Sequence, residues 1–390
     1  MPQAFVRCSA SMTRPRTNIC LNMIVKNESK VLPRLFRSLH QFIDFYVIVD
    51  TGSTDGTIEL IQSEMSKYGI EGQVHERPWV NFGTNRQQAL ELAVQAKRGD
   101  WLLFIDADEE LGVSDDRFYE KLEPGVSYDI EKHQGDLRYS VPHLLNVRNN
   151  SYHWEGPVHN YIMTDKGPKK RPLRKDVWIV FHLGEGAKSH GVTNEEKYLR
   201  DARLLEEDLE KHPENARSQF YLGQSYRDAG HWEKAYQAYK KRVQMGGWAE
   251  EAFVAQLEAG KIAAKLERGD SEVLGELLMA YNLRPIRAEP LYELARYFRQ
   301  KKNYAMAALF ARSGAHMTQP ADSVFVSQGV YRWRLLDELA VSSYWIDDFA
   351  GSLAACNELL ARVEAGEQLP GADLERVHAN LQAAQEKLRS

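Results

Sequence analysis

The chain has 390 residues, more than one ordinary domain holds, so two domains are expected. Its 43% hydrophobic and 27% charged residues are typical of a soluble globular protein, and the net charge of −5 gives no general attraction to nucleic acid. The scattered cysteines Cys8, Cys20 and Cys356 form no Cys-x-x-Cys pair, which argues against a zinc site or a disulfide framework and favours a reducing, cytoplasmic setting.

The first segment, residues 1–17, carries Arg7, Arg14 and Arg16 but no continuous apolar core. We therefore expect a flexible N-terminal tail and no signal peptide. The longest apolar runs, such as 177–181, have the length of a strand, so no transmembrane segment is expected.

Residues 18–183 then alternate short apolar runs with helical stretches. This alternation predicts an α/β domain, at 18–191, with a right-handed and mostly parallel sheet, and further strands over 137–181. The expected strands are 19–25, 45–49, 73–76 and 101–105, and the expected helices are 29–40, 55–67 and 84–97.

Two of these strands end in carboxylates. The strand at 45–49 runs into Asp50, and the strand at 101–105 runs into Asp106 and Asp108. Open parallel sheets bind ligands outside the carboxyl ends of their strands, so we expect the three acids at one rim. Paired carboxylates in that place suit a hard divalent cation such as Mg²⁺.

The turn after Asp50 has two interpretations. Asp55 either caps the next helix, whose apolar face begins with Ile58, or takes part in the site. Asp50 precedes that cap and sits where the strand stops, so capping does not account for it.

From about Asn194 onward the pattern is helical throughout, which predicts an all-α domain at 192–390. Two registers fit the tetratricopeptide pattern, in which Leu-Gly, Tyr and Ala occupy fixed offsets of a helix-turn-helix. They are Tyr221-Leu222-Gly223, Tyr226, Gly230, Ala235 and Tyr239, and then Leu294-Ala295, Phe298, Ala307 and Ala311. A weaker unit is expected around Gly260 and a last one around Leu339, and the spacing of Pro285 and Pro320 is close to the repeat period. Such repeats present a concave face for protein or peptide contact, with homodimerisation as the alternative.

Three ordered motifs, 19–28, 49–57 and 104–110, together resemble family-two glycosyltransferases with the GT-A fold. With the repeats, the chain is most similar to the bacterial subgroup that carries C-terminal tetratricopeptide repeats. That subgroup includes sublancin-type peptide S-glycosyltransferases and lipopolysaccharide-core glycosyltransferases. The resemblance implies an inverting transfer from a nucleotide sugar, usually a UDP-sugar with Mg²⁺ or Mn²⁺, to a peptide, protein or glycan acceptor.

The resemblance also implies which residues bind the donor. Glu28 would line the nucleotide pocket, Asp50 would contact the uracil or ribose, and Arg86 would approach the base or the phosphates. Arg86 has a plain alternative, a surface ion pair with an acid of its own helix such as Glu91.

For the metal, the resemblance implies that Asp108 is a ligand and that Asp106 holds the ribose or a metal-bound water. His182 would complete the metal or pyrophosphate site, or else be a core histidine bonded to backbone. Trp79 and Trp154 either stack on the uracil or sugar or pack in the core.

One departure from the family concerns the catalytic base. Members commonly have His-Glu after Trp-x-Gly-x-Val, whereas here His159 is followed by Asn160. An inverting enzyme needs a base near the attacking group, which leaves His159 and Glu155. An extended chain would turn both to the same face; alternatively, His159 hydrogen-bonds the diphosphate.

The segment 166–175 holds six basic residues in ten. It is either a solvated loop, a lid that reaches the pyrophosphate, or a docking site for a phosphorylated or nucleic-acid acceptor. Its place between His159 and His182 favours the lid over the docking site.

The expected function is that of a cytoplasmic, metal-dependent glycosyltransferase whose repeats recruit the acceptor or a second copy. One alternative is a repeat-based interaction protein with a degenerate transferase domain, against which the intact acids Asp50, Asp106 and Asp108 argue. The other is a nucleotidyltransferase, against which the lack of a Gly-rich triphosphate loop argues.

Overall fold

The structure is a computed structural model that describes residues 18–135, 137–148, 150–164, 169–173, 177–182, 193–322 and 324–389. These residues form two compact units. Of those described, the sheet unit takes 18–131, 141–155 and 160–182, and the repeat unit takes 132–140, 156–159 and 193–389. The expected N-terminal tail, residues 1–17, and the expected domain boundary near residue 191 lie outside the described residues.

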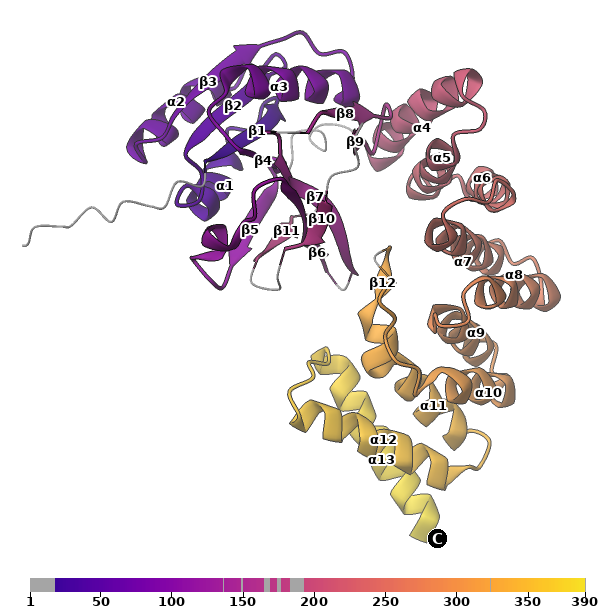
Figure 1. The fold of residues 1–390 in the computed structure, drawn as a ribbon. Coiled ribbons are helices and arrows are strands. Elements are labelled where there is room, and N and C mark those ends of the chain that lie inside the picture. The colour runs from indigo at the N-terminus through magenta and orange to yellow at the C-terminus, as the bar shows by residue number, and fades with distance from the viewer. Residues whose placement is uncertain are drawn as a thin grey trace, which may run out of the picture. The chain divides into compact units, whose positions relative to one another are not determined.

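The sheet unit alternates strands and helices as far as β4 and continues in strands (Figure 1). Its elements are β1 (Ile19–Val25), α1 (Leu32–Leu39), β2 (Phe45–Asp50), α2 (Thr57–Lys67), β3 (Glu71–Glu76), α3 (Phe82–Ala96), β4 (Trp101–Phe104), β5 (Glu109–Val113), a 3₁₀ helix (Phe118–Lys121), β6 (Val126–Gln134), β7 (Leu137–Asn146), β8 (Tyr152–Glu155), β9 (Tyr161–Thr164), β10 (Lys169–Pro172) and β11 (Val177–Phe181). The predicted strands and helices before residue 106 are confirmed. The largest shift is at α1, which begins at Leu32 because Pro33 favours the first turn of a helix.

The alternation of side chains along β1 explains the two cores of this unit. Ile19, Leu21 and Met23 join the core that includes α1 and α2, while Cys20 joins the core that includes α3. Successive strand residues point to opposite faces, so both faces of the sheet are covered by helices. The buried amide of Asn22 donates to the carbonyl oxygens of Val47 and Ala89, which ties β1 to β2 and α3.

The strand order is β3-β2-β1-β4-β7-β6-β11-β5, with β10 beside β6, and β8 and β9 form a small sheet of their own. The run β3-β2-β1-β4 is parallel, as predicted. After β4 the sheet becomes mixed, because β7 runs antiparallel to β4 and β11 antiparallel to β5. Consecutive strands without an intervening helix lack the long crossover that parallel pairing needs, and β8 and β9 accordingly pair antiparallel. β10 lies parallel to β6, from which β7, β8 and β9 separate it in the sequence.

The repeat unit consists of helices that pack against their neighbours in sequence (Figure 1). They are α4 (Asn194–Lys211), α5 (Ala216–Asp228), α6 (Trp232–Gln244), α7 (Ala249–Lys265), α8 (Asp270–Leu283), α9 (Glu289–Gln300), α10 (Tyr304–Gly314), α11 (Leu335–Tyr344), α12 (Phe349–Glu364) and α13 (Gly371–Arg389). The predicted repeats are confirmed: the two strong registers are α5–α6 and α9–α10, and the two weaker ones are α7–α8 and α11–α12. Among the described helices, none is long and apolar enough to cross a bilayer.

Small residues at the repeat positions allow the helices to approach closely. A Cβ atom on Gly223 would lie 2.8 Å from the ring of Tyr239, and one on Gly260 would lie 2.6 Å from Leu277. Both distances are shorter than packed carbon atoms tolerate, so a larger residue at either position would displace the facing side chain.

The connection between α10 and α11 departs from the repeat pattern. It contains β12 (Val326–Ser327), which pairs with the start of β7, and a π-helical turn (Val330–Arg334). Pro320 lies within this long connection. The prediction that its spacing from Pro285 reflects the repeat period is therefore wrong.

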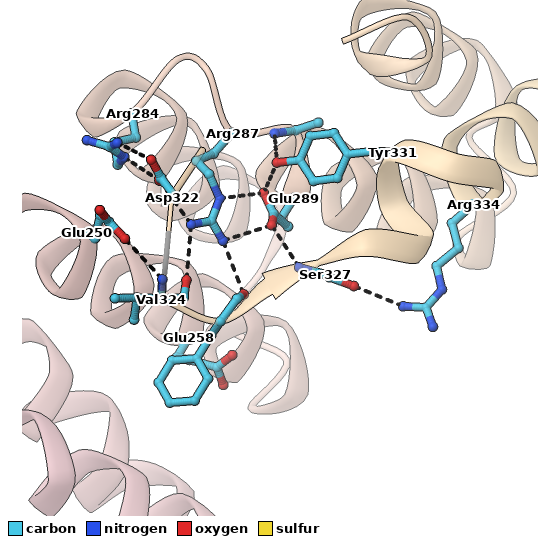
Figure 2. A network of polar contacts seen from close by, with 12 residues as sticks. Glu250, Glu258, Arg284, Arg287, Glu289, Asp322, Val324, Ser327, Tyr331 and Arg334 are labelled. Atoms are coloured by element: carbon cyan, nitrogen blue, oxygen red, sulfur yellow. Dashed lines mark hydrogen bonds and ion pairs between the residues drawn. The ribbon is translucent and has the colours of Figure 1, made fainter. Parts of the chain in front are cut away.

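A buried arginine fixes that connection (Figure 2). Arg287, fully buried, makes two hydrogen bonds to Glu289, of 2.9 and 2.8 Å, and bonds of 3.2 Å to Asp322 and to the carbonyl oxygens of Val324 and Phe325. A buried cation needs such complete pairing, because burial without partners is costly.

Candidate functional site

The carboxyl ends of β1, β2 and β4 meet at one edge of the sheet, since the three strands are parallel neighbours. Asp50 is the last residue of β2, Asp106 follows the end of β4, and Glu28 lies just beyond β1. The expectation that the acids share a rim therefore agrees with the strand topology.

Asp50 is buried at this rim and has one oxygen in use. Its Oδ1 accepts hydrogen bonds of 2.9 Å from the backbone N–H groups of Gly52 and Ser53, which fixes the turn after β2. Its Oδ2 is buried and meets no hydrogen-bond donor among the described residues. A buried carboxylate oxygen is costly without a donor, so a bound group with an N–H or O–H would satisfy it.

Asp55 fastens two loops together. Its Oδ2 accepts from the backbone N–H and the hydroxyl of Ser29, and its Oδ1 accepts from the backbone N–H and the hydroxyl of Thr57. Burial raises the pKa of Asp55, but these hydrogen bonds outweigh it and hold that pKa below its ordinary value. Thr57 in turn accepts from the N–H of half-buried Glu28 at 2.9 Å, so the loops that follow β1 and β2 form one connected rim.

Arg86 reaches the second acid of the rim. Its Nη2 donates to Oδ1 of Asp106 at 2.6 Å, and its guanidinium lies 5.1 Å from the ring centroid of Trp154. The alternative pairing with Glu91 is not the one seen for this side chain, because Glu91 accepts from Gln87 at 2.9 Å. Arg86 thus belongs to the rim.

The turn that carries Asp106 and Asp108 is held by a residue that the sequence analysis did not single out. Fully buried Glu109 accepts the backbone N–H of Asp106 at 2.9 Å through its Oε2. Glu109 directly follows the Asp-x-Asp pair, and that position is the signal that could have identified it. The sequence analysis considered acids at the ends of strands, whereas Glu109 is buried at the beginning of β5.

His182 lies beside the Asp-x-Asp turn. Its backbone N–H donates to the carbonyl oxygen of Asp108 at 3.2 Å, and its Nε2 lies 3.1 Å from Glu110. The side chain is partly exposed and so is not a core histidine. Within the described residues, no three His, Cys, Asp or Glu side chains are grouped at metal-ligand spacing.

Glu155 ends β8 with both carboxylate oxygens engaged. Oε1 lies 3.0 Å from Nε2 of His153, and Oε2 accepts from the hydroxyl of Tyr161. The Tyr161 hydrogen bond lowers the pKa of Glu155, burial opposes it less strongly, and His153 lowers it further. A carboxylate with a depressed pKa is a weak base.

The chain between Glu155 and His159 is not extended, so the premise of the expected shared face is wrong. The backbone turns between them, with φ of 86° at Gly156 and 49° at His159. His159 belongs to the repeat unit, where its ring stacks on that of Tyr221 with centroids 4.1 Å apart. Val158 is buried in the core of the same unit, which anchors this short segment.

Two sequence candidates remain, Trp79 and the basic segment 166–175. Trp79 is 42% exposed and meets only an edge contact with Phe82 among the described rings. Of the basic segment 166–175, residues 169–172 form β10 beside β6, and Arg171 pairs with Glu123. The residues 166–168 and 174–175 lie outside the described residues.

Comparison with known proteins finds a family model that matches the part of the chain that contains this edge of the sheet. The family model described as "Glycosyl transferase family 2" matches residues 20–123, which contain Glu28, Asp50, Arg86, Asp106 and Asp108.

Similar curated proteins include an uncharacterized glycosyltransferase of Rickettsia felis, 30% identical over 129 residues, which are 33% of this chain and 40% of that protein. The SPbeta prophage-derived glycosyltransferase SunS of Bacillus subtilis is 27% identical over 236 residues, 58% of this chain and 53% of its own. A TPR repeat-containing protein of Synechococcus elongatus is 36% identical over 93 residues, 24% of this chain and 21% of its own. The chain thus spans about half or less of the length of each relative.

Proposed function

We propose that this chain, whose residues 20–123 form a family-two glycosyl transferase domain, transfers a sugar with inversion from a nucleotide-sugar donor, a UDP-sugar, to a peptide, protein or glycan acceptor. The observation that carries the proposal is the unpartnered, buried carboxylate oxygen of Asp50, which lies at the same edge of the sheet as the Arg86–Asp106 pair. A buried acceptor and a positioned cation are what a base or ribose and a diphosphate require.

In this proposal Asp50 accepts an N–H or O–H of the uracil or ribose through Oδ2, and Glu28 lines the same pocket. Arg86 reaches the phosphates with N–H groups of its fork, which has five donors, while Asp106 holds it in place. The hydrogen bonds that Asp55 accepts from Ser29 and Thr57 hold the two loops together, so the pocket is formed before the donor arrives.

The side chains at this edge of the sheet also include suitable ligands for a divalent cation. Asp108 and Asp106 offer carboxylate oxygens and His182 an imidazole nitrogen, ligands that Mn²⁺ accepts, while Mg²⁺ would use the carboxylates and donor phosphates. A bound Mg²⁺ or Mn²⁺ would neutralise charge that develops on the departing diphosphate. Because one or two carboxylates suffice for a cation shared with phosphates, a preformed group of three side chains is not required.

For the base, the contacts of Glu155 favour His159. Glu155 has a lowered pKa and is engaged by Tyr161 and His153, whereas an imidazole is the side chain whose ordinary pKa suits proton transfer near neutral pH. We therefore assign proton removal from the acceptor to His159 and keep Glu155 as the rival.

The repeat unit is proposed to recruit the acceptor or to pair with a second copy. The exposed residues between Leu278 and Ile286, at the end of α8, are uncharged, and Leu278, Met279, Leu283 and Ile286 are 39–51% exposed. A twofold contact lays a surface on itself, and an uncharged apolar strip suffers no like-charge repulsion there. Light scattering of the full chain and of Met279→Lys tests this arrangement: an unchanged dimer, or no dimer in either protein, contradicts it.

A reducing compartment agrees with the described cysteines, since Cys20 and Cys356 are both buried and unpaired. We therefore propose a cytoplasmic enzyme.

The donor is tested by incubating the full chain with UDP-, GDP- and dTDP-sugars with and without Mn²⁺, and by following slow donor hydrolysis and the melting temperature. A productive donor should raise the melting temperature and be hydrolysed in the presence of Mn²⁺. Binding of a nucleotide sugar without hydrolysis under any condition would favour an interaction protein with a degenerate domain. Consumption of a nucleoside triphosphate and a sugar phosphate would favour a nucleotidyltransferase.

A further inference from the structure

We infer that Trp154 is a donor-site residue: its ring holds Arg86 against Asp106, and its buried indole N–H donates to an oxygen of the bound nucleotide sugar. The inference rests on the proposed function and adds a residue that lies outside the part of the chain matched to the family.

Trp154 is fixed by its surroundings. Its backbone N–H donates to Oε1 of Gln87 at 3.0 Å, so the small β8–β9 sheet is tied to α3 one residue after Arg86. Its ring meets the ring of Phe104 edge-on, with centroids 5.3 Å apart and 76° between the planes. Phe104 is the last residue of β4, two positions before Asp106, so the indole lies next to the acidic turn.

The indole face and the carboxylate hold Arg86 together. The guanidinium carbon of Arg86 lies 5.1 Å from the ring centroid of Trp154, and its Nη2 donates to Asp106 at 2.6 Å. A cation within about 6 Å of an indole face is attracted by the ring quadrupole. Contact on both sides limits the rotamers of a long side chain, so the fork is already oriented when the diphosphate binds.

The indole N–H supplies the second part of the inference. Nε1 of Trp154 is buried and has no hydrogen-bond acceptor among the described residues. An indole nitrogen is a donor and cannot accept, and a buried one usually finds a partner. Nucleotide sugars present phosphate and hydroxyl oxygens, which are the acceptors that this position requires.

The two contributions separate by substitution in the full chain. Trp154→Phe keeps an aromatic face and removes the donor, so UDP should bind about tenfold more weakly in the presence of Mn²⁺. Trp154→Leu removes the face as well, and the loss should reach about thirtyfold or more. Trp248→Phe, at a 50% exposed position of the repeat unit, is the control and should bind like the parent.

Calorimetric titration with UDP measures these affinities, and circular dichroism checks that each variant is folded. If Trp154→Leu does not fold, Trp154→Phe and a spectroscopic readout carry the test. With nitrogen-15-labelled tryptophan, the indole signal absent from Trp154→Phe identifies Trp154. That signal should move downfield when UDP is added to the parent protein, as an N–H does when it forms a hydrogen bond.

The outcomes are distinct. Parent protein that binds no nucleotide or nucleotide sugar overturns the proposed function. Parent protein that binds UDP, together with unchanged affinity in Trp154→Phe or an indole signal that does not move, overturns the inference and leaves the function standing.

Discussion

The imidazole ring of His159 lies flat against the phenol ring of Tyr221, with centroids 4.1 Å apart and 10° between the planes. The backbone of His159 has a φ of 49°, a left-handed conformation that residues other than glycine adopt when their surroundings enforce it. Arg217, one helical turn before Tyr221 on α5, places its guanidinium 5.0 Å from the same phenol ring. The first repeat therefore sets the plane of the ring to which we assign the base.

The assignment of the base predicts different outcomes for two substitutions. His159→Ala should bind the nucleotide sugar normally and lose about 10²- to 10⁴-fold in transfer, the usual contribution of a general base. Glu155→Gln should retain most of the transfer rate, because its carboxylate is engaged by Tyr161 and His153. Steady-state transfer and calorimetric UDP binding measure both. Normal transfer in His159→Ala with an inactive Glu155→Gln would reverse the assignment, and loss of donor binding in His159→Ala would indicate a phosphate contact.

The stacking predicts a graded series at Tyr221. Tyr221→Phe keeps the ring and should transfer at close to the parental rate. Tyr221→Leu frees the imidazole and should lower kcat about tenfold with little change in donor KM, because orientation of the acting group contributes to the barrier. Equal kcat values for the Phe and Leu variants, with both folded, would show that the stacking has no part in transfer.

The half-used carboxylate of Asp50 predicts a specific loss of nucleotide affinity. Asp50→Asn can keep an acceptor for the N–H groups of Gly52 and Ser53 while it replaces the unpartnered oxygen with an amide. UDP should bind at least tenfold more weakly, with a small change in the melting temperature. An Asp50→Ala protein would also lose the two turn hydrogen bonds and so is the less informative variant. Unchanged UDP affinity by calorimetry contradicts the role of Asp50.

The metal proposal predicts that Asp108→Asn abolishes Mn²⁺-dependent transfer and leaves the fold intact, since the side chain lies at the half-exposed end of the turn. Asp116→Asn, an exposed acid eight residues later, is the matched control and should transfer normally. Titration of Mn²⁺ into UDP-saturated protein reports metal affinity separately from turnover. Transfer that persists in Asp108→Asn, or in the parent protein after chelation, is inconsistent with the metal role.

The parts of the site that follow from strand periodicity were predictable. Apolar runs that end in acids predicted Asp50 and Asp106, and alternation with helices predicted that their strands are parallel. In the structure β2 and β4 both run parallel to β1, which lies between them, so both acids lie at one edge of the sheet. Contacts that depend on side-chain direction across distant segments were not predictable. The position of Arg86 between Trp154 and Asp106 joins α3, β8 and the turn after β4, and no spacing rule links these segments.

Backbone conformation explains the wrong expectation for Glu155 and His159. The extended-chain argument assumes ordinary φ values, and Gly156 and His159 both have positive φ. A positive φ is ordinary for glycine, so Gly156 is a weak sign of a turn in the sequence. His159 adopts a positive φ because Tyr221 and the buried Val158 hold the segment. Tyr221 lies more than 60 residues after His159 in the sequence, so the local sequence pattern does not reveal their contact.

The buried carboxylate of Glu258 predicts an acid-dependent loss of stability in the repeat unit. Glu258 lies on α7, 3.0 Å from Nη1 of Arg227 and 2.5 Å from Nζ of Lys261. Burial raises the pKa of Glu258, but Lys261 and then Arg227 outweigh it and lower the pKa from 4.5 to about 2. A folded-state pKa below the unfolded one stabilises the fold above the unfolded value, and this stabilisation disappears as pH falls through the folded value. The window for Glu258 therefore runs from pH 4.5 down to about 2.

Other acids of this unit titrate in the same range, so the test compares variants. At neutral pH, Glu258→Gln should destabilise the repeat unit by on the order of 3 kcal/mol, because it leaves two cations without their shared carboxylate. The difference from the parent protein should shrink as pH falls through the window. Glu338→Gln is the control, since burial raises the pKa of Glu338 against the effect of Arg299, and its difference should change with pH in the opposite direction. Denaturant unfolding followed by circular dichroism at several pH values measures both, and a pH-independent difference for Glu258→Gln would show that its carboxylate is not stabilised by the pair.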